Sequence, residues 1–190
     1  MPAAPVAAAG YVRRMPIVPD EKDWTWVLER VCPECGFDTA GVDRDALAGR
    51  IAATSRAWEE VLWHPDVRQR PDEATWSPLE YACHVRDVHR VYAGRVSRML
   101  AEDDPYYENW DQDVTAVEDR YDEQDPAVVA SELAAAGDAL GVVFAGVTGA
   151  GWDRTGRRSD GASFTVDSIA RYYLHDIEHH LWDVTSTPSV

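Results

Sequence analysis

Basic residues are scarce in this chain. Its 190 residues include 18 lysines and arginines against 34 acidic residues, which gives a formal net charge of −16 at pH 7. A surface that binds nucleic acid or an anionic membrane needs clustered positive charge, because it must attract phosphate groups. The composition therefore argues against both partners.

Long apolar runs and cysteines are also scarce. No stretch approaches the roughly 18 uninterrupted apolar residues of a membrane-spanning helix, and the first ten residues lack the basic start and apolar middle of a signal peptide. Only three cysteines are present, two of them at Cys32 and Cys35, so a disulfide-stabilised fold is not expected. We expect a cytoplasmic protein with reduced thiols.

Amphipathic helical patterns account for most of the sequence. With 45% hydrophobic residues, the chain is long enough for one domain with its own core and too short for two. Apolar residues recur at helical intervals in four segments, and no strong strand pattern competes with them. These segments are 43–63, 77–100, 126–146 and 166–184. The sequence therefore predicts an all-α four-helix bundle.

Capping residues indicate where three of these helices begin. Ser77, followed by Pro78 and Glu80, predicts a capping box with a proline in the first turn. Asp125 also stands directly before a proline, and Thr165 can cap the last helix. The second helix has the clearest start of the four.

Three regions follow from these boundaries. They are a short irregular N-terminal arm at 1–42, the bundle at 43–184 and a tail at 185–190. Within the arm, the Ala- and Pro-rich residues up to about 20 are expected to be loosely held, and 24–28 to form an extended strip that docks on the bundle. Residues 101–124 are expected to be an acidic crossover loop with a functional role.

Three histidines on two of the helices form the main candidate site. His175 and His179 are four residues apart, which stacks them on one helical face. His84 shares a face with apolar residues and is expected to point into the core. Three imidazoles meeting there would bind a divalent ion, Zn²⁺ or else Ni²⁺, Fe²⁺ or Mn²⁺, and leave one coordination position open, as catalytic sites do. The alternative is a solvated pair and a core imidazole bonded to a carbonyl.

Several polar side chains near these histidines could assist them. Carboxylates that could orient the imidazoles are Asp87, Asp176, Glu178 and Asp183. Of these, Glu178 or Asp87 could also accept a proton in catalysis. His180 points about 100° away from the predicted pair and becomes a ligand only if the helix register differs. His64 and His89 are expected at the surface.

The segment Cys32-Pro33-Glu34-Cys35 looks like one knuckle of a zinc ribbon. Two thiolates can bind zinc, but a closed site needs four ligands, and the sequence offers no second knuckle. Three interpretations stay open. The segment is a turn with idle thiols, a metal site completed by a histidine or carboxylate from elsewhere, or a redox dithiol.

Arg154, Arg157 and Arg158 form a basic cluster before the last helix. In so acidic a protein, this cluster could hold an anionic substrate or the carboxylate of a thiol cofactor. The alternative is that it pairs with the acidic crossover loop, where Asp111 and Asp113 would be its partners.

The segments 76–88, 109–113 and 175–180 together resemble the DinB superfamily of four-helix bundles, with the likeness strongest over about 43–184. The resemblance implies an up-down-down-up helix order. It also implies a metal held by one histidine of the second helix and an HxxxH-type pair of the last, the positions of His84, His175 and His179. The superfamily includes S-transferases that depend on mycothiol or bacillithiol, and the mycothiol-dependent maleylpyruvate isomerase.

The resemblance implies a metal-dependent enzyme that activates a low-molecular-weight, mycothiol-like thiol for transfer to an electrophilic small molecule. Trp110 and Asp111 of the crossover loop, with Arg157 and Arg158, are the candidate substrate contacts. Two alternatives stay open. One is a hydrolase that uses metal-bound hydroxide, and the other is a non-catalytic bundle in which the metal is structural or which forms a homodimer through exposed aromatic side chains.

Overall fold

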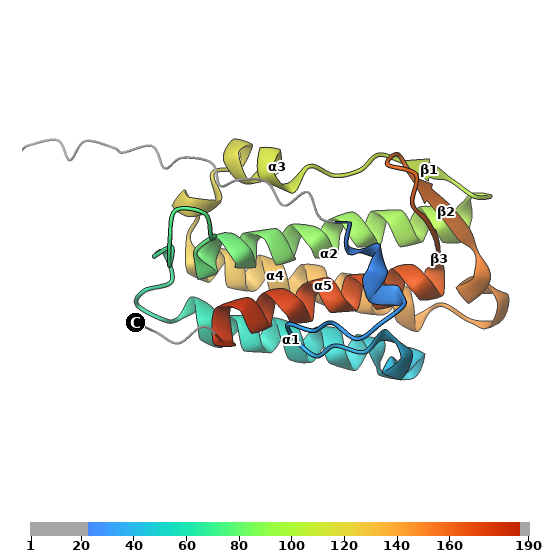
Figure 1. Cartoon of the computed structure of the whole chain (residues 1–190), viewed down its shortest axis with the longest axis horizontal. Coiled ribbons are helices and arrows are strands. Elements are labelled where there is room, and N and C mark those ends of the chain that lie inside the picture. The colour runs from blue at the N-terminus through green and yellow to red at the C-terminus, as the bar shows by residue number, and fades with distance from the viewer. Residues whose placement is uncertain (1–22, 187–190) are drawn as a thin grey trace, which may run out of the picture.

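Four long helices form the body of the protein. The computed structural model describes residues 23–186, so the expectations for the first 20 residues and for the end of the tail lie outside the described residues. The four helices are α1 (Leu47–Leu62), α2 (Pro78–Ala101), α4 (Pro126–Ala145) and α5 (Val166–Ser186). The predicted all-α bundle is confirmed, and each helix lies close to its predicted range (Figure 1).

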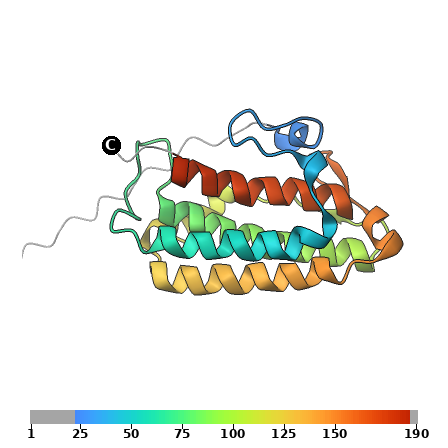
Figure 2. The same cartoon turned by 90° about the horizontal axis from the view of Figure 1, so that it is seen from below.

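The directions of the four helices follow an uncommon order along the chain. α1 and α5 run in one direction along the bundle, whereas α2 and α4 run in the other (Figure 1). α4 and α5 each pack against both α1 and α2, and they lie on opposite sides of that pair (Figure 2). The order is therefore up-down-down-up. Because α2 and α4 run in the same direction, the chain must return along the whole bundle between them, and residues 101–124 form this crossover.

The start of α2 is fixed by the predicted capping box. Glu80 N donates to Ser77 Oγ at 3.3 Å, while the Glu80 carboxylate accepts from Ser77 N at 2.8 Å. Arg70 Nε donates to the same carboxylate at 2.9 Å, and the carboxylate is almost fully buried. These contacts set where α2 begins and hence where each residue of its second turn points.

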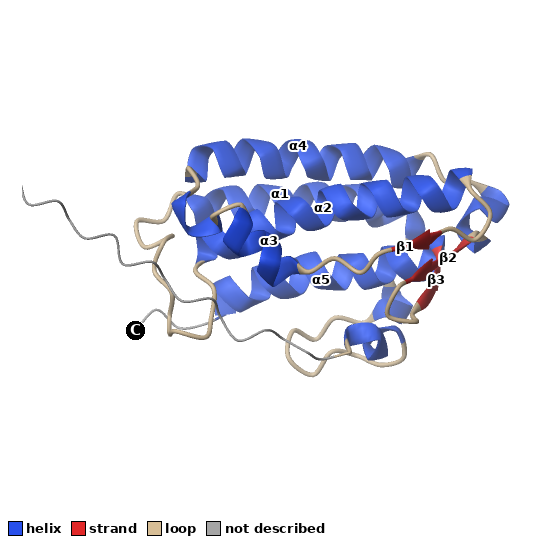
Figure 3. Ribbon diagram, turned by 90° about the horizontal axis from the view of Figure 1, so that it is seen from above, coloured by secondary structure: helices blue, strands red, loops and turns tan. Residues whose placement is uncertain are grey.

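The crossover and the connector before α5 contain structure that the sequence did not reveal. β1 (Tyr106–Tyr107) and the short helix α3 (Gln112–Glu118) lie within the predicted loop. β1 pairs in parallel with β2 (Thr155–Arg158), which pairs antiparallel with β3 (Ser163–Thr165), at one end of the bundle (Figure 3). Strands of two to four residues are too short to give an alternating signal, so the expectation of a plain loop was wrong.

Residues 23–46, here called the N-terminal segment, lie along the outside of α5 (Figure 2). Trp24–Leu28 is a 3₁₀ helix rather than the expected extended strip, because the Asp23 carboxylate caps it by accepting from Thr25 N at 2.9 Å. The expected docking of its tryptophans on the bundle does occur, since the Trp24 ring contacts His175 and His179 of α5. The segment thus adds a layer over the last helix.

α4 is the one helix within residues 23–186 whose length and mean hydropathy, 1.6, would suffice to cross a membrane. Glu132 and Asp138 interrupt its apolar sequence, which is why no continuous run is visible. Leu133 and Leu140 are fully buried against the bundle, whereas Val142 is 73% exposed. Its composition is therefore that of a bundle helix with one open side.

Ser77→Ala should lower the free energy of unfolding by about 1–2 kcal/mol, because it removes the hydroxyl that accepts from Glu80 N at a buried helix start. Ser97 is exposed within the same helix, so Ser97→Ala is the matched control and should change stability by less than about 0.5 kcal/mol. Equilibrium urea unfolding monitored by circular dichroism measures both. Equal losses in the two variants would contradict a capping role.

Candidate metal centre

Two pairs of ligand side chains alternate along α5. His175 and His179 form one pair and Asp176 and His180 the other, each with the four-residue spacing that stacks side chains on one helical face. Because the pairs are offset by one residue, their faces diverge by about 100°. α5 therefore presents ligands toward two different neighbours.

The first cluster joins α5 to α2. One ligand atom each from His84, Asp176 and His180 lies within 4.8 Å of the others. Asp176 Oδ1 is 3.6 Å from His84 Nε2 and 3.2 Å from His180 Nε2. The His84 side chain is 1% exposed, whereas those of Asp176 and His180 are about one-fifth exposed, so the cluster opens toward solvent on the α5 side. We call these three residues the open cluster.

Buried polar atoms in the open cluster lack hydrogen-bond partners. Both ring nitrogens of His84 and Oδ1 of Asp176 are inaccessible to solvent and accept or donate no hydrogen bond. Such orphaned groups are costly, since burial without a partner forfeits about 1–3 kcal/mol per group. A divalent cation at this point would satisfy Nε2 of His84 and Oδ1 of Asp176, the two atoms that face each other, so the residues present fit a metal.

The protonation states of His84 and Asp176 suit metal ligation, whereas His180 holds a proton. Burial lowers the pKa of His84 despite the nearby Asp176 carboxylate, so its imidazole is neutral. Burial opposes charge on Asp176, but the close approach of the His180 and His84 rings outweighs it and holds the pKa of Asp176 well below the usual range. Burial also opposes charge on His180, yet Asp176 and Asp183 raise its pKa to about 9. The cluster therefore offers an ionised carboxylate and one neutral imidazole, and a metal ion that binds His180 must displace its proton.

Aromatic rings wall the open cluster. Trp110 stacks on His84 with ring centroids 5.4 Å apart and planes within 3°, and Trp76 lies at 5.3 Å from the same imidazole. Tyr81 contacts His180 at 5.1 Å. Trp110 is held in turn by Thr115 of α3, whose Oγ1 accepts from the indole N–H at 2.8 Å. The crossover thus covers the site, as expected of a long loop with a function.

The second cluster joins α5 to the N-terminal segment. Cys32, Cys35, His175 and His179 each place a sulfur or nitrogen atom within 4.8 Å of the others. Cys32 Sγ is 3.8 Å from His179 Nδ1, and the buried Nε2 of His175 has no hydrogen-bond partner. Burial lowers the pKa of His175 to about 4, with a further contribution from His179. We call these four residues the knuckle cluster.

Comparison with known proteins agrees with the fold. The family model of the DinB superfamily matches residues 64–184, which is more than half of the chain. The chain belongs to the DinB superfamily. No curated protein matches it. Among solved structures, YfiT from Bacillus subtilis, described as a probable metal-dependent hydrolase with an unusual four-helix bundle topology, matches with a TM-score of 0.70 and 14% identity, over 75% of this chain and 84% of that one. At that identity the likeness shows the shared fold.

This DinB protein does not gather the three predicted histidines in one ligand set. His84 is grouped with Asp176 and His180, whereas His175 and His179 are grouped with the cysteines. The rotation of α5 about its axis accounts for the difference, because it turns Asp176 and His180 toward α2 in place of His175 and His179. The signal was present in the sequence, because Asp176 and His180 have the same four-residue spacing as the predicted pair.

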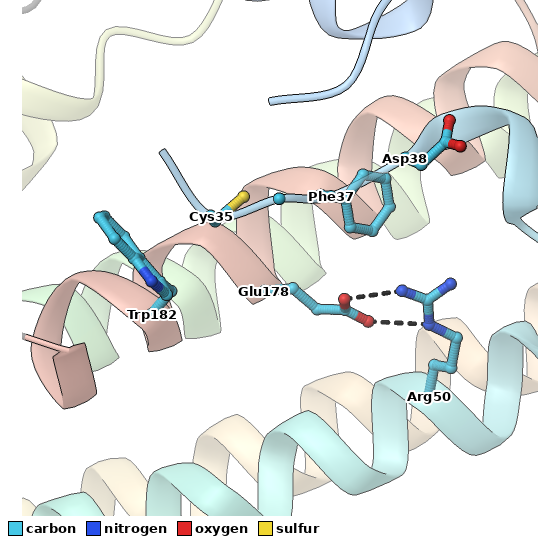
Figure 4. A pocket seen from close by; sticks show the side chains of 7 residues that line it. Cys35, Phe37, Asp38, Arg50, Glu178 and Trp182 are labelled. Carbon is cyan, nitrogen blue, oxygen red and sulfur yellow. Dashed lines mark hydrogen bonds and ion pairs between the residues drawn. The ribbon is translucent and has the colours of Figure 1, made fainter. Parts of the chain in front are cut away.

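The two carboxylates expected as proton acceptors are engaged elsewhere. Glu178 accepts from Arg50 Nε at 2.9 Å and from Arg50 Nη2 at 2.7 Å, and this ion pair lines a hollow of about 300 Å³ beside Cys35 and Trp182 (Figure 4). Asp87 is buried and accepts from Arg86 and Arg90. Neither carboxylate joins the open cluster.

Asp183 connects the two clusters. Its Oδ2 lies 3.0 Å from His180 Nδ1, and its Oδ1 lies 3.6 Å from His179 Nε2. In both cases the carboxylate faces the ring nitrogen that points away from the cluster. A carboxylate in this position fixes the tautomer and orientation of a ligand imidazole, so one side chain orients a histidine of each cluster.

Only one of the predicted substrate contacts touches the open cluster. Trp110 does so through His84, whereas Asp111 caps α3 by accepting from Val114 N at 2.9 Å. Arg157 pairs with Asp104 at 2.8 Å, and Arg158 pairs with Asp160 at 2.7 Å. Arg157 therefore pairs with the acidic crossover loop, as the alternative expected, although its partner is Asp104 and not Asp111.

Arg158 nevertheless lies on the same side of α5 as the open cluster. Its guanidinium lies 5.8 Å from the ring of Tyr172, which stands one turn before Asp176 on the same face. Arg154 instead donates to the backbone carbonyls of Met99 and Glu102 at the end of α2. Arg158 thus contacts α5 one turn before Asp176, while its charge is paired with Asp160.

Of the two histidines expected at the surface, only His64 is exposed there. His89 is fully buried, and its Nδ1 lies 2.7 Å from the Tyr173 hydroxyl. The expectation for His89 was wrong because α2 is packed on several sides, so that its faces toward α4 and α5 are both covered. A buried tyrosine partner makes this histidine part of the core.

Tyr121→Phe tests the structural role of the Asp87 network. The Tyr121 hydroxyl donates to Asp87 Oδ2 at 2.6 Å in a buried setting, so its loss should lower the free energy of unfolding by about 2 kcal/mol. Tyr106→Phe, at a tyrosine that is 51% exposed, is the control and should have little effect. Urea unfolding and elemental analysis of both variants check this. A loss of bound metal in Tyr121→Phe without a loss of stability would contradict it.

Proposed function

We propose that this DinB protein is a metal-dependent enzyme whose open cluster, His84, Asp176 and His180, holds a divalent ion such as Zn²⁺. The observation that carries the proposal is the gathering of three ligand side chains within 4.8 Å between α2 and α5, where the ring nitrogens of His84 and Oδ1 of Asp176 are buried without a hydrogen-bond partner. Three protein ligands are the number found at catalytic rather than structural sites. The name given to YfiT supports metal dependence in a related fold.

Thiol transfer to an electrophilic small molecule is the reaction we favour. A bound divalent ion would supply Lewis acidity, lowering the pKa of the nucleophile that reaches it. A thiol needs less help than water, because its ordinary pKa is about 8.5 against about 15.7 for water. Glu178 and Asp87 are both held in ion pairs, which favours a nucleophile that ionises without a protein base.

The surrounding residues have roles that suit this reaction. Trp110, Trp76 and Tyr81 provide an apolar wall for an organic substrate. Arg158, which contacts Tyr172 one turn before Asp176, is the residue we assign to a carboxylate of the thiol or substrate, which would compete with Asp160 for the guanidinium. In the transfer, a bond forms between the thiol sulfur and an electrophilic carbon, the displaced group leaves with its bonding electrons, and the thiol proton passes to solvent.

Hydrolysis is the second candidate, favoured by the description of YfiT as a probable metal-dependent hydrolase. It differs from thiol transfer in one readily measured respect, since water replaces the added thiol as nucleophile. The non-enzymatic alternative is a bundle in which the metal stabilises the fold and no reaction is catalysed. That the protein forms a homodimer and that it is cytoplasmic are also proposals.

His84→Ala and His180→Ala should each remove about one equivalent of metal and lower turnover by more than about 100-fold. Loss of a residue that only orients a metal ligand already lowers metal affinity or activity by about 10–100-fold, and loss of the ligand itself should cost more. His64→Ala, at an exposed histidine outside both clusters, should retain metal and turnover. Elemental analysis and product analysis of zinc-loaded protein with a chromogenic electrophile, with and without a low-molecular-weight thiol, measure these effects.

The outcomes separate the candidates. A product that contains the thiol, and forms only when thiol is added, supports transfer, whereas an equal rate of hydrolysed product in both conditions supports hydrolysis. Full metal content in both His84→Ala and His180→Ala would overturn the open cluster as the metal site.

A further inference from the structure

The knuckle cluster is a four-ligand constellation that the proposed reaction does not use. Its ligand atoms come from a loop of the N-terminal segment and from α5, and they lie within 4.8 Å of one another. Cys32 is 1% exposed, His175 4% and His179 5%, so three of the four ligands are withdrawn from solvent. Within this group, the buried Nε2 of His175 has no hydrogen-bond partner, which a bound cation would supply.

We propose that Cys32, Cys35, His175 and His179 bind Zn²⁺ in a closed structural site that fastens the N-terminal segment to α5. Two thiolates and two imidazoles are a donor set of structural zinc sites with four protein ligands and no open position. The charges of two thiolates cancel that of the ion, so the complete site is neutral and can be buried at low cost.

The loop that carries the cysteines has the shape this site requires. Gly36 N donates to Cys32 O at 2.9 Å and Cys32 N donates to Phe37 O at 2.9 Å, which closes a tight turn around Cys35. Gly36 adopts a φ of +75°, a left-handed conformation that a residue with a side chain rarely takes. The turn therefore holds both thiols toward α5.

The surroundings of the two histidines complete the site. The rings of Trp24 and Phe37 lie 5.7 and 5.5 Å from that of His175 and exclude water from it. His179 directs Nδ1 toward Cys32 Sγ, while its Nε2 faces Glu34 Oε2 at 3.4 Å. An imidazole with one nitrogen toward the ligand set and the other toward a carboxylate is the usual arrangement of a metal-bound histidine.

The site shares no ligand with the open cluster, so its metal content can be tested apart from the proposed reaction. It explains how the short 3₁₀ helices of the N-terminal segment, whose own hydrogen bonds stabilise them weakly, keep their position against α5. It also explains why the thiols are paired in sequence although the remainder of a zinc ribbon is missing, since α5 supplies the other two ligands.

Cobalt substitution tests the ligand set in the full chain. Metal-free protein reloaded with Co²⁺ should show thiolate-to-cobalt charge-transfer absorption. The Cys35→Ser variant should lose this absorption, whereas the His84→Ala variant should keep it. When zinc is used instead, the wild type should bind about two equivalents of Zn²⁺ per chain and Cys35→Ser about one. Cys83→Ala is the matched cysteine control, because Cys83 is buried outside the cluster, and it should keep the band.

Alkylation of the wild-type chain gives a second measurement that needs no variant. Cys35 is partly exposed, so a maleimide should modify it after chelation and the modification should fall at least tenfold when Zn²⁺ is restored, as read by peptide mass mapping. Equal modification with and without zinc, a Cys32–Cys35 disulfide recovered from reduced preparations, or cobalt spectra without thiolate bands would overturn the proposal. Loss of metal in His84→Ala alone bears on the open cluster and not on this site.

Discussion

The rotation of α5 about its own axis is the constraint on which both candidate sites depend. Its two ligand pairs differ by one residue, so a turn of about 100° would exchange the neighbours that they face. α5 is held in its observed rotation by Ile169, Tyr173 and Ile177, which are at most 1% exposed. Burial of these apolar side chains against α1 and α2 therefore decides that Asp176 and His180 meet His84, leaving the remaining pair to the N-terminal segment.

The two clusters are coupled through shared supports. Asp183 lies against one histidine of each, and Trp24 packs on the helix face of the knuckle cluster while Trp110 packs on His84. A metal in the knuckle cluster would add a restraint on α5 from its outer side, opposite to the restraint that α1 and α2 impose from within. The position of the ligands in the open cluster then depends on both restraints rather than on bundle packing alone.

Much of the fold could be predicted because long amphipathic helices and strong caps carry their signal locally. The capping box at Ser77 and the proline after Asp125 located two helices without any tertiary information. The site was predicted less well, since the choice between His179 and His180 depends on which face of α5 contacts α2. That choice is set by packing over the whole helix. The partnership of Cys32 with His179 spans 147 residues and has no local signal at all.

The donor atoms assign different tasks to the two clusters. In the knuckle cluster, two thiolates would neutralise a divalent ion and two imidazoles would complete its four positions, which suits a buried site whose contribution is to folding. One carboxylate and two imidazoles leave a bound divalent ion with a net positive charge, and the partial exposure of Asp176 and His180 gives an anionic ligand access to it. In a protein with a net charge of −16, this local positive centre would be the place where a thiolate or a carboxylate is attracted rather than repelled. The chemistry is therefore expected at the cluster between α2 and α5, where the aromatic walls of Trp76 and Trp110 receive the apolar part of the same molecule.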